Sequence, residues 1–244
     1  MPLKFFDAHT HVQFAAYDAD RDEVILRALE GGVAIINVGT NSETSEAAAR
    51  MTEKYQGSVY ATVGIHPTHA SGSSYHDKQE LKTAPNETGE VFDYEFYKKL
   101  ALREKVVAIG ECGLDLFRIE DGVTSIEEQK EKQKAVFVKH IELAREVRKP
   151  LMIHCRSAFG DLINTLTTDR SKLNTIPGVI HFFSGTKEDA RALLDLGFYF
   201  TFGGVITFVR DYDEVVRYIP IDRILSETDA PYVTPAPYRG GRNE

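Results

Sequence analysis

The chain has 244 residues, and its 29 Lys and Arg against 37 Asp and Glu give a formal net charge of −8. With 27% charged and 42% hydrophobic residues it has the composition of a globular protein, which excludes a disordered or fibrous class. The acidity argues against a broad, non-specific grip on nucleic acid, which depends on Lys and Arg, but it permits a small site that handles a phosphate through metal ions.

The cysteine and hydropathy patterns limit the cellular compartments in which we expect this protein. The two cysteines, Cys112 and Cys155, lie far apart and form no Cys-x-x-Cys pair, which excludes a disulfide scaffold or a zinc ribbon. No apolar run approaches the roughly 18 residues that cross a bilayer. A strand-like run follows the N-terminus at once, so we expect no signal peptide, no membrane partner and a cytoplasmic protein, or a nuclear one in a eukaryote.

Short β-branched or apolar runs alternate with amphipathic stretches along the whole chain. Strands are predicted at residues 5–9, 33–38, 59–65, 106–111, 151–154, 179–182, 198–202 and 224–227. Helices are predicted at residues 21–30, 43–55, 91–104, 126–148, 158–167, 187–196 and 212–218. Eight strands give units of about 30 residues, each a strand, a helix and two loops. This alternation predicts a parallel sheet and one α/β domain over residues 1–244, and it favours a single (β/α)8 TIM barrel over an open doubly wound sheet.

Two parts of the chain depart from this alternation. Residues 68–90, after the third predicted strand, are polar and without periodicity, and a loop of this length is either a functional lid on the catalytic face or a tolerated insertion. The sequence given stops just past the last strand, so we expect the barrel to lack its final C-terminal helix. The first and last strands would then expose apolar faces, which predicts a homo-oligomer or cover by another segment.

Residues of metal-ligand type gather at the ends of the predicted strands. They are His9 and His11 on the first strand, Glu111 on the fourth, His154 on the fifth, His181 on the sixth, and Glu227 and Asp229 on the eighth. The strand period of two places His9 with His11, and Glu227 with Asp229, on one face. Alone, a His pair could be a solvated strand end and a lone Glu a salt-bridge partner. Together these side chains meet at the C-terminal face, where barrel enzymes hold their active sites.

The donor types indicate the metal chemistry. The four imidazoles with two of these carboxylates, Glu111 and Asp229, suit zinc, manganese, iron or cobalt, whereas magnesium prefers a shell richer in oxygen. Six candidate ligands exceed the four of a structural zinc site. A carboxylate with His on both sides suits two divalent ions roughly 3.5–4 Å apart, which activate water and clamp both oxygens of a displacement. The pattern therefore predicts a hydrolase, and no Gly-x-Gly-x-x-Gly or P-loop motif competes with it.

Seven short blocks carry a specific resemblance and follow one another along the chain. They are DAHTH at 7–11, GIHP at 64–67, IGECGLD at 109–115, IHCR at 153–156, HFFSG at 181–185, ETDAP at 227–231 and RGGRNE at 239–244. In these blocks the chain resembles the TatD family of metal-dependent deoxyribonucleases, within the amidohydrolase-like barrels. The resemblance implies 3′→5′ exonuclease action on DNA with magnesium or another divalent ion. The ligand sets that it implies are His9, His11, Glu111 and Asp229 for one metal, and Glu111, His154 and His181 for a second.

Related dinuclear barrels are said to bridge their metals with a carboxylated lysine near the fourth strand. Glu111 stands at that strand end and supplies a bridging carboxylate without modification, which favours the TatD-like branch. Asp229 is our candidate for the residue that both binds a metal and takes the proton of the attacking water. Glu227 could be a second general base, could orient Asp229, or could be a structural carboxylate.

Five further residues are candidates for substrate contact. Arg156 shares the face of His154 and could take phosphate oxygens in a bidentate fork, with a surface salt bridge as the alternative. His66 could hydrogen-bond the scissile phosphate or cap a helix beside Pro67. Asp115 and Arg118 could contact substrate or pair with each other, and Ser184 belongs to the block that begins at His181.

The remaining histidines and the cysteines are expected to have ordinary roles. His140 lies three residues after Phe137 on an apolar helical stripe and is interpreted as a packed histidine. His69 and His76 lie in the polar loop and are expected to be solvated. Cys112 and Cys155 each follow a candidate ligand, so we expect them to be buried between barrel and helices, with a thiolate ligand as the alternative.

Three functions remain open at this point. The first is a divalent-metal-dependent nuclease that removes nucleotides from the 3′ end of single-stranded DNA. The second is a metal-dependent amide, lactone or ester hydrolase that acts on a small molecule or an acylated RNA end. The third is a metal-binding interaction protein without activity, against which the complete ligand set argues.

Overall fold

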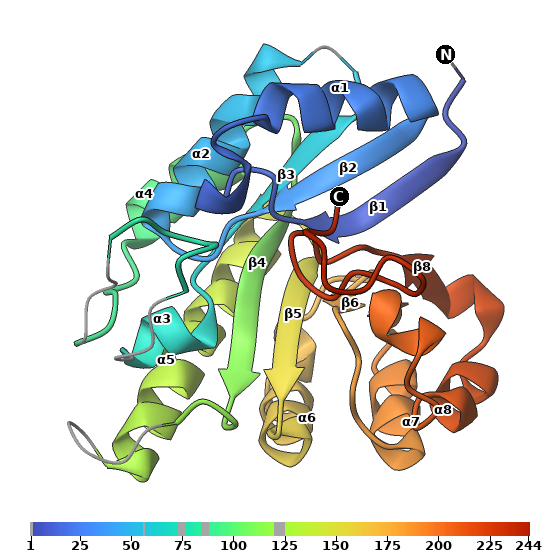
Figure 1. The fold of residues 1–244 in the computed structure, drawn as a ribbon. Coiled ribbons are helices and arrows are strands. Elements are labelled where there is room, and N and C mark those ends of the chain that lie inside the picture. Colours follow the sequence, from blue (N-terminus) through green and yellow to red (C-terminus); the bar gives the residue numbers. More distant parts are fainter. Residues whose placement is uncertain (1, 56, 73–76, 84–87, 120–124) are drawn as a thin grey trace.

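The fold is an eight-stranded parallel sheet whose strands follow one another in chain order (Figure 1). The computed structural model describes residues 2–55, 57–72, 77–83, 88–119 and 125–244. The strands are β1 (Phe5–Thr10), β2 (Val33–Val38), β3 (Val59–Val63), β4 (Val106–Asp115), β5 (Leu151–Arg156), β6 (Gly178–Ile180), β7 (Tyr199–Phe202) and β8 (Ile224–Ser226). A single bridge between Thr10 and Ala230 joins the β8 side to β1, so the sheet is a nearly closed barrel. The predicted (β/α)8 fold is confirmed.

Helices alternate with these strands, and five of the eight are capped by the side chain of the residue before them. They are α1 (Arg21–Gly31), α2 (Ser42–Lys54), α3 (Pro67–Ser71), α4 (Tyr94–Ala101), α5 (Ile126–Val147), α6 (Phe159–Thr168), α7 (Lys187–Asp195) and α8 (Asp213–Tyr218). Capping boxes start α2 at Asn41 and α7 at Thr186, where side chain and main chain bond reciprocally. Each predicted helix overlaps one of these, and α3 is additional. None of the helices in the described ranges is long and apolar enough to cross a membrane.

Strand β4 is longer than predicted because its pairing with β5 continues past Glu111 as far as Asp115. Gly110 makes this possible at a point where the two backbones come close together. A Cβ atom at Gly110 would lie 2.2 Å from the Met152 carbonyl oxygen, and the residue has φ +139°. Only glycine therefore fits directly before Glu111, which the chain carries into the barrel.

The main core lies between the sheet and the helices. The predicted stripe of α5 packs there, with Phe137 and Ile141 fully buried. His140 is also buried: its Nδ1 donates to the Val136 carbonyl at 2.8 Å, and its Nε2 accepts from the Ile65 amide at 2.9 Å. This confirms the packed histidine. Cys112 and Cys155 are buried as expected, and burial raises the pKa of both thiols.

The polar loop after β3 differs from the prediction in two ways. It opens with helix α3, which His66 caps through its ring nitrogen, so the segment is not irregular throughout. His69 is not solvated, because Glu80 folds back and accepts from its Nε2 at 2.8 Å, with both side chains mostly buried. The sequence carried no signal for this contact between residues eleven positions apart. His76 lies outside the described residues.

Residues 227–244 are all described and contain no helix after β8. Asn243 holds this segment in place, since its Nδ2 donates to the carbonyls of Thr228 at 2.9 Å and Tyr232 at 2.8 Å. The C-terminus lies beside β1 (Figure 1). Leu3, Phe5 and Leu225 are exposed. The predicted self-association through this side of the barrel stays a prediction.

Candidate metal centre

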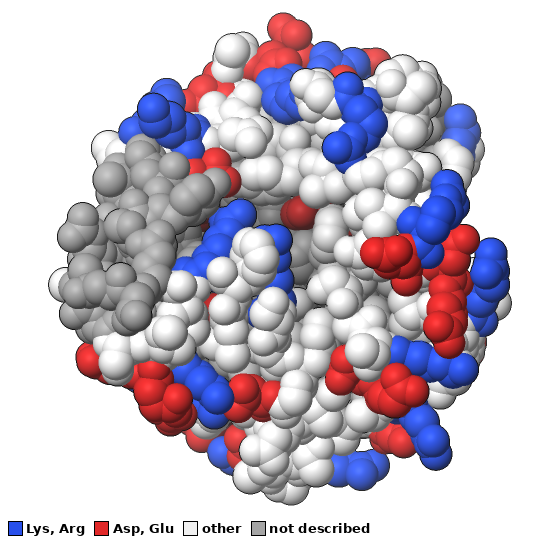
Figure 2. Space-filling model, turned by 60° about the horizontal axis from the view of Figure 1, so that its bottom comes forward, with Lys and Arg blue, Asp and Glu red and all other residues white. Residues whose placement is uncertain are grey.

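A cavity of about 380 Å³ opens at the carboxyl ends of the strands. Figure 2 shows this end of the molecule hollowed, with acidic side chains deep in the hollow and basic side chains beside its mouth. The candidate residues that line the cavity are His11, His66, Glu111, Asp115, Arg118, His154, Arg156, His181, Ser184 and Asp229. The structure thus brings together residues from six of the eight strand ends, and His9 lies beneath them, fully buried.

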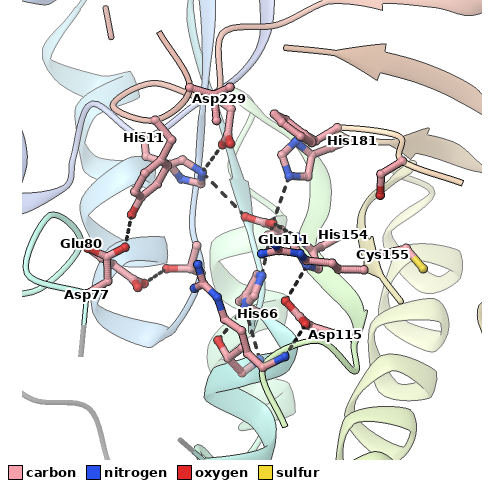
Figure 3. Close-up of a pocket in the computed structure, with 18 of the residues that line it drawn as sticks. His11, His66, Asp77, Glu80, Glu111, Asp115, His154, Cys155, His181 and Asp229 are labelled. Atoms are coloured by element: carbon pink, nitrogen blue, oxygen red, sulfur yellow. Dashed lines mark hydrogen bonds and ion pairs between the residues drawn. The ribbon is translucent and has the colours of Figure 1, made fainter. Parts of the chain in front are cut away.

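Glu111 occupies the centre of this group (Figure 3). Its Oε2 lies 3.5 Å from His9 Nε2 and 3.8 Å from His11 Nε2. Its Oε1 lies 3.1 Å from His154 Nδ1 and 3.4 Å from His181 Nε2. His66 Nε2 also lies 3.6 Å from Oε1. The two carboxylate oxygens therefore face two separate groups of imidazoles, as a bridging carboxylate does.

Asp229 joins His9 and His11 in the group of side chains on the Oε2 side of Glu111. Its Oδ1 lies 3.4 Å from His11 Nε2 and 3.7 Å from His9 Nε2, and the two imidazole nitrogens are 3.0 Å apart. An ion with tetrahedral bonds of about 2.0–2.1 Å separates its ligand atoms by roughly 3.3 Å. The donor atoms around each oxygen of Glu111 are spaced to fit one ion each.

In three of the histidines, the ring nitrogen that points away from Glu111 lies beside a hydrogen-bond acceptor. The other ring nitrogen is therefore the one that is free to bind a cation. Nδ1 of His11 lies 2.8 Å from the Val38 carbonyl, Nδ1 of His181 lies 3.1 Å from Glu227 Oε2, and Nε2 of His154 lies 3.1 Å from Asp115 Oδ2. These acceptors hold the proton on the outer nitrogen and leave a lone pair on the nitrogen that faces Glu111. Such partners are typical of metal-binding histidines.

Charge in the centre favours a cation. Burial raises the pKa of Glu111, but His66, His181 and His154 outweigh it and hold that pKa well below its usual range. Burial lowers the pKa of His181, but Glu227 and Glu111 outweigh it and raise that pKa well above its usual range. The carboxylates thus draw positive charge into the site, and protons and divalent ions compete for the same lone pairs. His9 differs, because burial and His181 lower its pKa to about 3 and keep it neutral.

Glu227 does not lie beside Asp229, contrary to the shared face that the strand period predicts. The strand ends at Ser226, and Asp229 turns into the cavity with φ 54°, a left-handed conformation. Glu227 is buried behind His181 instead, where it accepts from Thr201 Oγ1 at 2.5 Å and from the Phe182 amide at 3.0 Å. Its contacts are those of a residue that orients His181.

The structure shows the contacts of the candidate substrate residues. Asp115 does not form an ion pair with Arg118: its Oδ1 accepts from the Arg118 main-chain amide at 3.1 Å while Oδ2 orients His154. Arg156 lies flat over the Phe117 ring at 3.7 Å, and within the described ranges no carboxylate pairs with it. His66 caps α3 and also lines the cavity, so both of its predicted roles are compatible with the structure.

Several cavity residues were missed by the sequence interpretation. They are Phe14, Thr40, Thr68, Asp77, Glu80, Phe182, Tyr212, Tyr232 and Val233, together with Cys155, which had been placed away from the site. Asp77 and Glu80 belong to the polar loop after β3, whose position was the one available signal. Tyr232 donates to Asp77 Oδ2 at 2.8 Å, a contact across 155 residues that no local pattern indicates.

Comparison with known proteins identifies a family and relatives that are described as nucleases or metal-dependent hydrolases. The family described as TatD related DNase matches residues 6–244. The metal-dependent hydrolase YabD of Bacillus subtilis (strain 168), described as uncharacterized, is 38% identical over 98% of this chain and 85% of its own length. The 3′-5′ ssDNA/RNA exonuclease TatD of Erwinia billingiae (strain Eb661) is 35% identical over 96% of this chain and 82% of its own length.

Solved structures agree with this. YjjV, a TatD homologue from Escherichia coli K12, superimposes with a TM-score of 0.76 at 27% identity, over 98% of this chain and 84% of that one. A TatD family hydrolase from Entamoeba histolytica superimposes with a TM-score of 0.75 at 26% identity, over 96% of this chain and 77% of that one.

Proposed function

The chain belongs to the TatD family of metal-dependent hydrolases, and from this premise we propose that it removes nucleotides from the 3′ end of single-stranded DNA. The observation that carries the proposal is the bridged donor set around Glu111, with Arg156 lining the same cavity. The name of the Erwinia relative, an exonuclease on single-stranded DNA and RNA, supports the polarity and the substrate. A neutral ester or amide would need no arginine there.

In this proposal each carboxylate oxygen of Glu111 would bind one of two divalent ions. His9, His11 and Asp229 would hold one with Oε2, and His154 and His181 would hold the other with Oε1. When bound, such ions supply Lewis-acid stabilisation of the phosphate and a water of lowered pKa. The nitrogen-rich donor set suits zinc, manganese, iron or cobalt. The use of magnesium in the reaction is implied only by the family resemblance.

Asp229 is the carboxylate best placed to accept a proton from the attacking water. Its side chain is 15% exposed and lines the cavity, whereas Glu111 is 4% exposed between the two donor sets and Glu227 is sealed behind His181. A general base must reach both the water and a route for its proton, and Asp229 is the most exposed of the three carboxylates.

The cavity also offers donors for a phosphate. The Thr68 amide donates to His66 Nδ1 at 3.3 Å, which leaves the His66 proton on Nε2, the nitrogen that lies 3.6 Å from Glu111 Oε1. Burial and His154 lower the pKa of His66 to about 3, so it stays a neutral donor. Stacking on Phe117 holds the plane of the Arg156 guanidinium, and a fixed guanidinium donates two parallel hydrogen bonds to phosphate oxygens.

The test compares hydrolysis of single-stranded DNA and RNA, labelled at either end, with hydrolysis of an ester and lactone panel. We expect the metal-loaded protein to release label from the 3′ end first, a chelator to abolish release, and added divalent metal to restore it. Hydrolysis of the ester panel without hydrolysis of DNA would favour the alternative activity. Metal binding without turnover of any substrate would favour an interaction protein.

Glu227→Gln tests whether Glu227 orients His181 or takes a proton itself. The amide cannot hold the His181 proton on Nδ1 as the carboxylate does, so we expect metal affinity to fall by roughly 10–100-fold. Turnover should fall at limiting metal and recover when metal is raised by a similar factor. Titration of activity against metal concentration checks this. Turnover that stays low at saturating metal would instead identify Glu227 as a proton acceptor.

A further inference from the structure

One side of the cavity is lined by Asp77 and Glu80, which belong to residues 77–80, here called the strap. Its backbone accepts two hydrogen bonds from the turn after β1: Ala15 N to Glu80 O at 3.1 Å and Ala16 N to Gln79 O at 2.9 Å. Glu80 Oε1 accepts from Thr40 Oγ1 at 2.5 Å and from His69 Nε2 at 2.8 Å. These bonds tie the strap to the ends of β1, β2 and β3.

A fifth contact fixes the carboxylate that the strap presents. Asp77 Oδ2 accepts from the Tyr232 hydroxyl at 2.8 Å, and Oδ1 accepts from the Gln79 amide at 2.8 Å. Tyr232 follows β8, so the strap spans the mouth from the β3 side to the β8 side. Figure 3 shows Asp77 and Glu80 on the side of His11, away from His154 and Cys155.

The opposite side of the cavity has the opposite chemistry. Arg156 ends β5, which lies across the barrel from β1, and its guanidinium stacks on Phe117. Ser184, which follows β6, and Tyr212, which precedes α8, line the same cavity, and Tyr212 interacts electrostatically with Arg156. A polyanion that extends out of the cavity meets a cation on this side, and it meets carboxylates on the side of the strap.

Resting on the proposed nuclease function, we infer that the strap sets end specificity and that Asp77 reads the terminal 3′-hydroxyl. The strand leaves over Arg156, and the terminal nucleoside lies against the strap. At about 380 Å³ the cavity is near the lower end of the roughly 300–1,000 Å³ that small-ligand pockets span, which leaves little room for a continuing chain.

Charge supplies the discrimination. A 3′-hydroxyl can donate a hydrogen bond to a carboxylate that still has free lone pairs, and both Asp77 oxygens have them. A 3′-phosphate, or the phosphate of a further nucleotide, brings negative charge against Asp77. Like charges at such a site repel by an amount that corresponds to roughly tenfold or more in rate. The strap would therefore reject internal positions and phosphorylated ends.

The experiment uses the metal-loaded protein and two 5′-labelled single-stranded DNA oligonucleotides that differ only in a 3′-hydroxyl or a 3′-phosphate. We expect the wild type to prefer the hydroxyl end by at least about tenfold in kcat/KM. Asp77→Asn keeps the size and one acceptor but removes the charge, so the preference should fall by roughly tenfold. Asp222→Asn, exposed at the other end of the barrel, removes the same charge and should keep the wild-type ratio.

The outcomes separate this inference from the proposed function. An equal rate on both ends, or an unchanged preference in Asp77→Asn, overturns the role of the strap while DNA hydrolysis by the wild type still supports the nuclease. Failure of the wild type to cleave either oligonucleotide overturns both. Should Asp77→Asn fail to fold, as a thermal melt would show, Tyr232→Phe decides: it releases the Asp77 carboxylate and should also lower the preference.

Discussion

Replacing Glu111 with Gln is expected to lower turnover by at least about 10³-fold and to reduce the bound metal to less than one ion per chain. Among the described residues, Glu111 alone faces both donor sets, and its two oxygens lie 3.1–3.8 Å from five imidazole nitrogens. The amide removes the bridging charge and turns an N–H group toward one imidazole pair. Metal content per folded chain and turnover, measured on the same preparation, check this.

Glu104→Gln is the matched control, because Glu104 is exposed just before the other end of β4. It removes the same charge from the same strand and should keep both metal and turnover. A Glu111→Gln protein that retains a full metal complement would contradict the bridging role. Equal loss in the control would assign the effect to the strand and not to the site.

Strand-end ligands could be predicted from the sequence because their signals are local. A β-branched run followed by His or Glu marks both the strand and the side chain that it carries, and parallel strands in one barrel bring their ends together. His154 and His181 were placed correctly at the cavity for this reason. His140 was recognised as packed because the apolar stripe around it has helical period.

The same local logic failed where the chain leaves the sheet. The period of two holds only inside a strand, and β8 ends at Ser226, so it could not relate Glu227 to Asp229. The strap was unpredictable for a different reason: Asp77 and Glu80 are placed by Tyr232, Thr40 and the turn after β1, which are distant in sequence. Polar composition alone cannot distinguish a segment that is held by such hydrogen bonds from a solvated loop.

Asp229→Asn is expected to lower kcat by roughly 10²–10⁴-fold while the protein stays folded. Asn keeps an oxygen that can remain near His9 and His11, so metal in the first donor set should be weakened but not lost. The amide cannot accept a proton at neutral pH, so added metal should not restore turnover. This separates Asp229 from Glu227, whose Gln variant recovers at high metal.

Single-turnover hydrolysis at saturating metal, with metal content measured in parallel, checks this expectation. Asp222→Asn again serves as the control, since Asp222 precedes the same strand at its other end and should behave as the wild type. Recovery of Asp229→Asn at high metal would make Asp229 a ligand alone. The proton would then have to leave through another group that lines the cavity, and His66, a neutral imidazole 3.6 Å from Glu111, would be the next residue to replace.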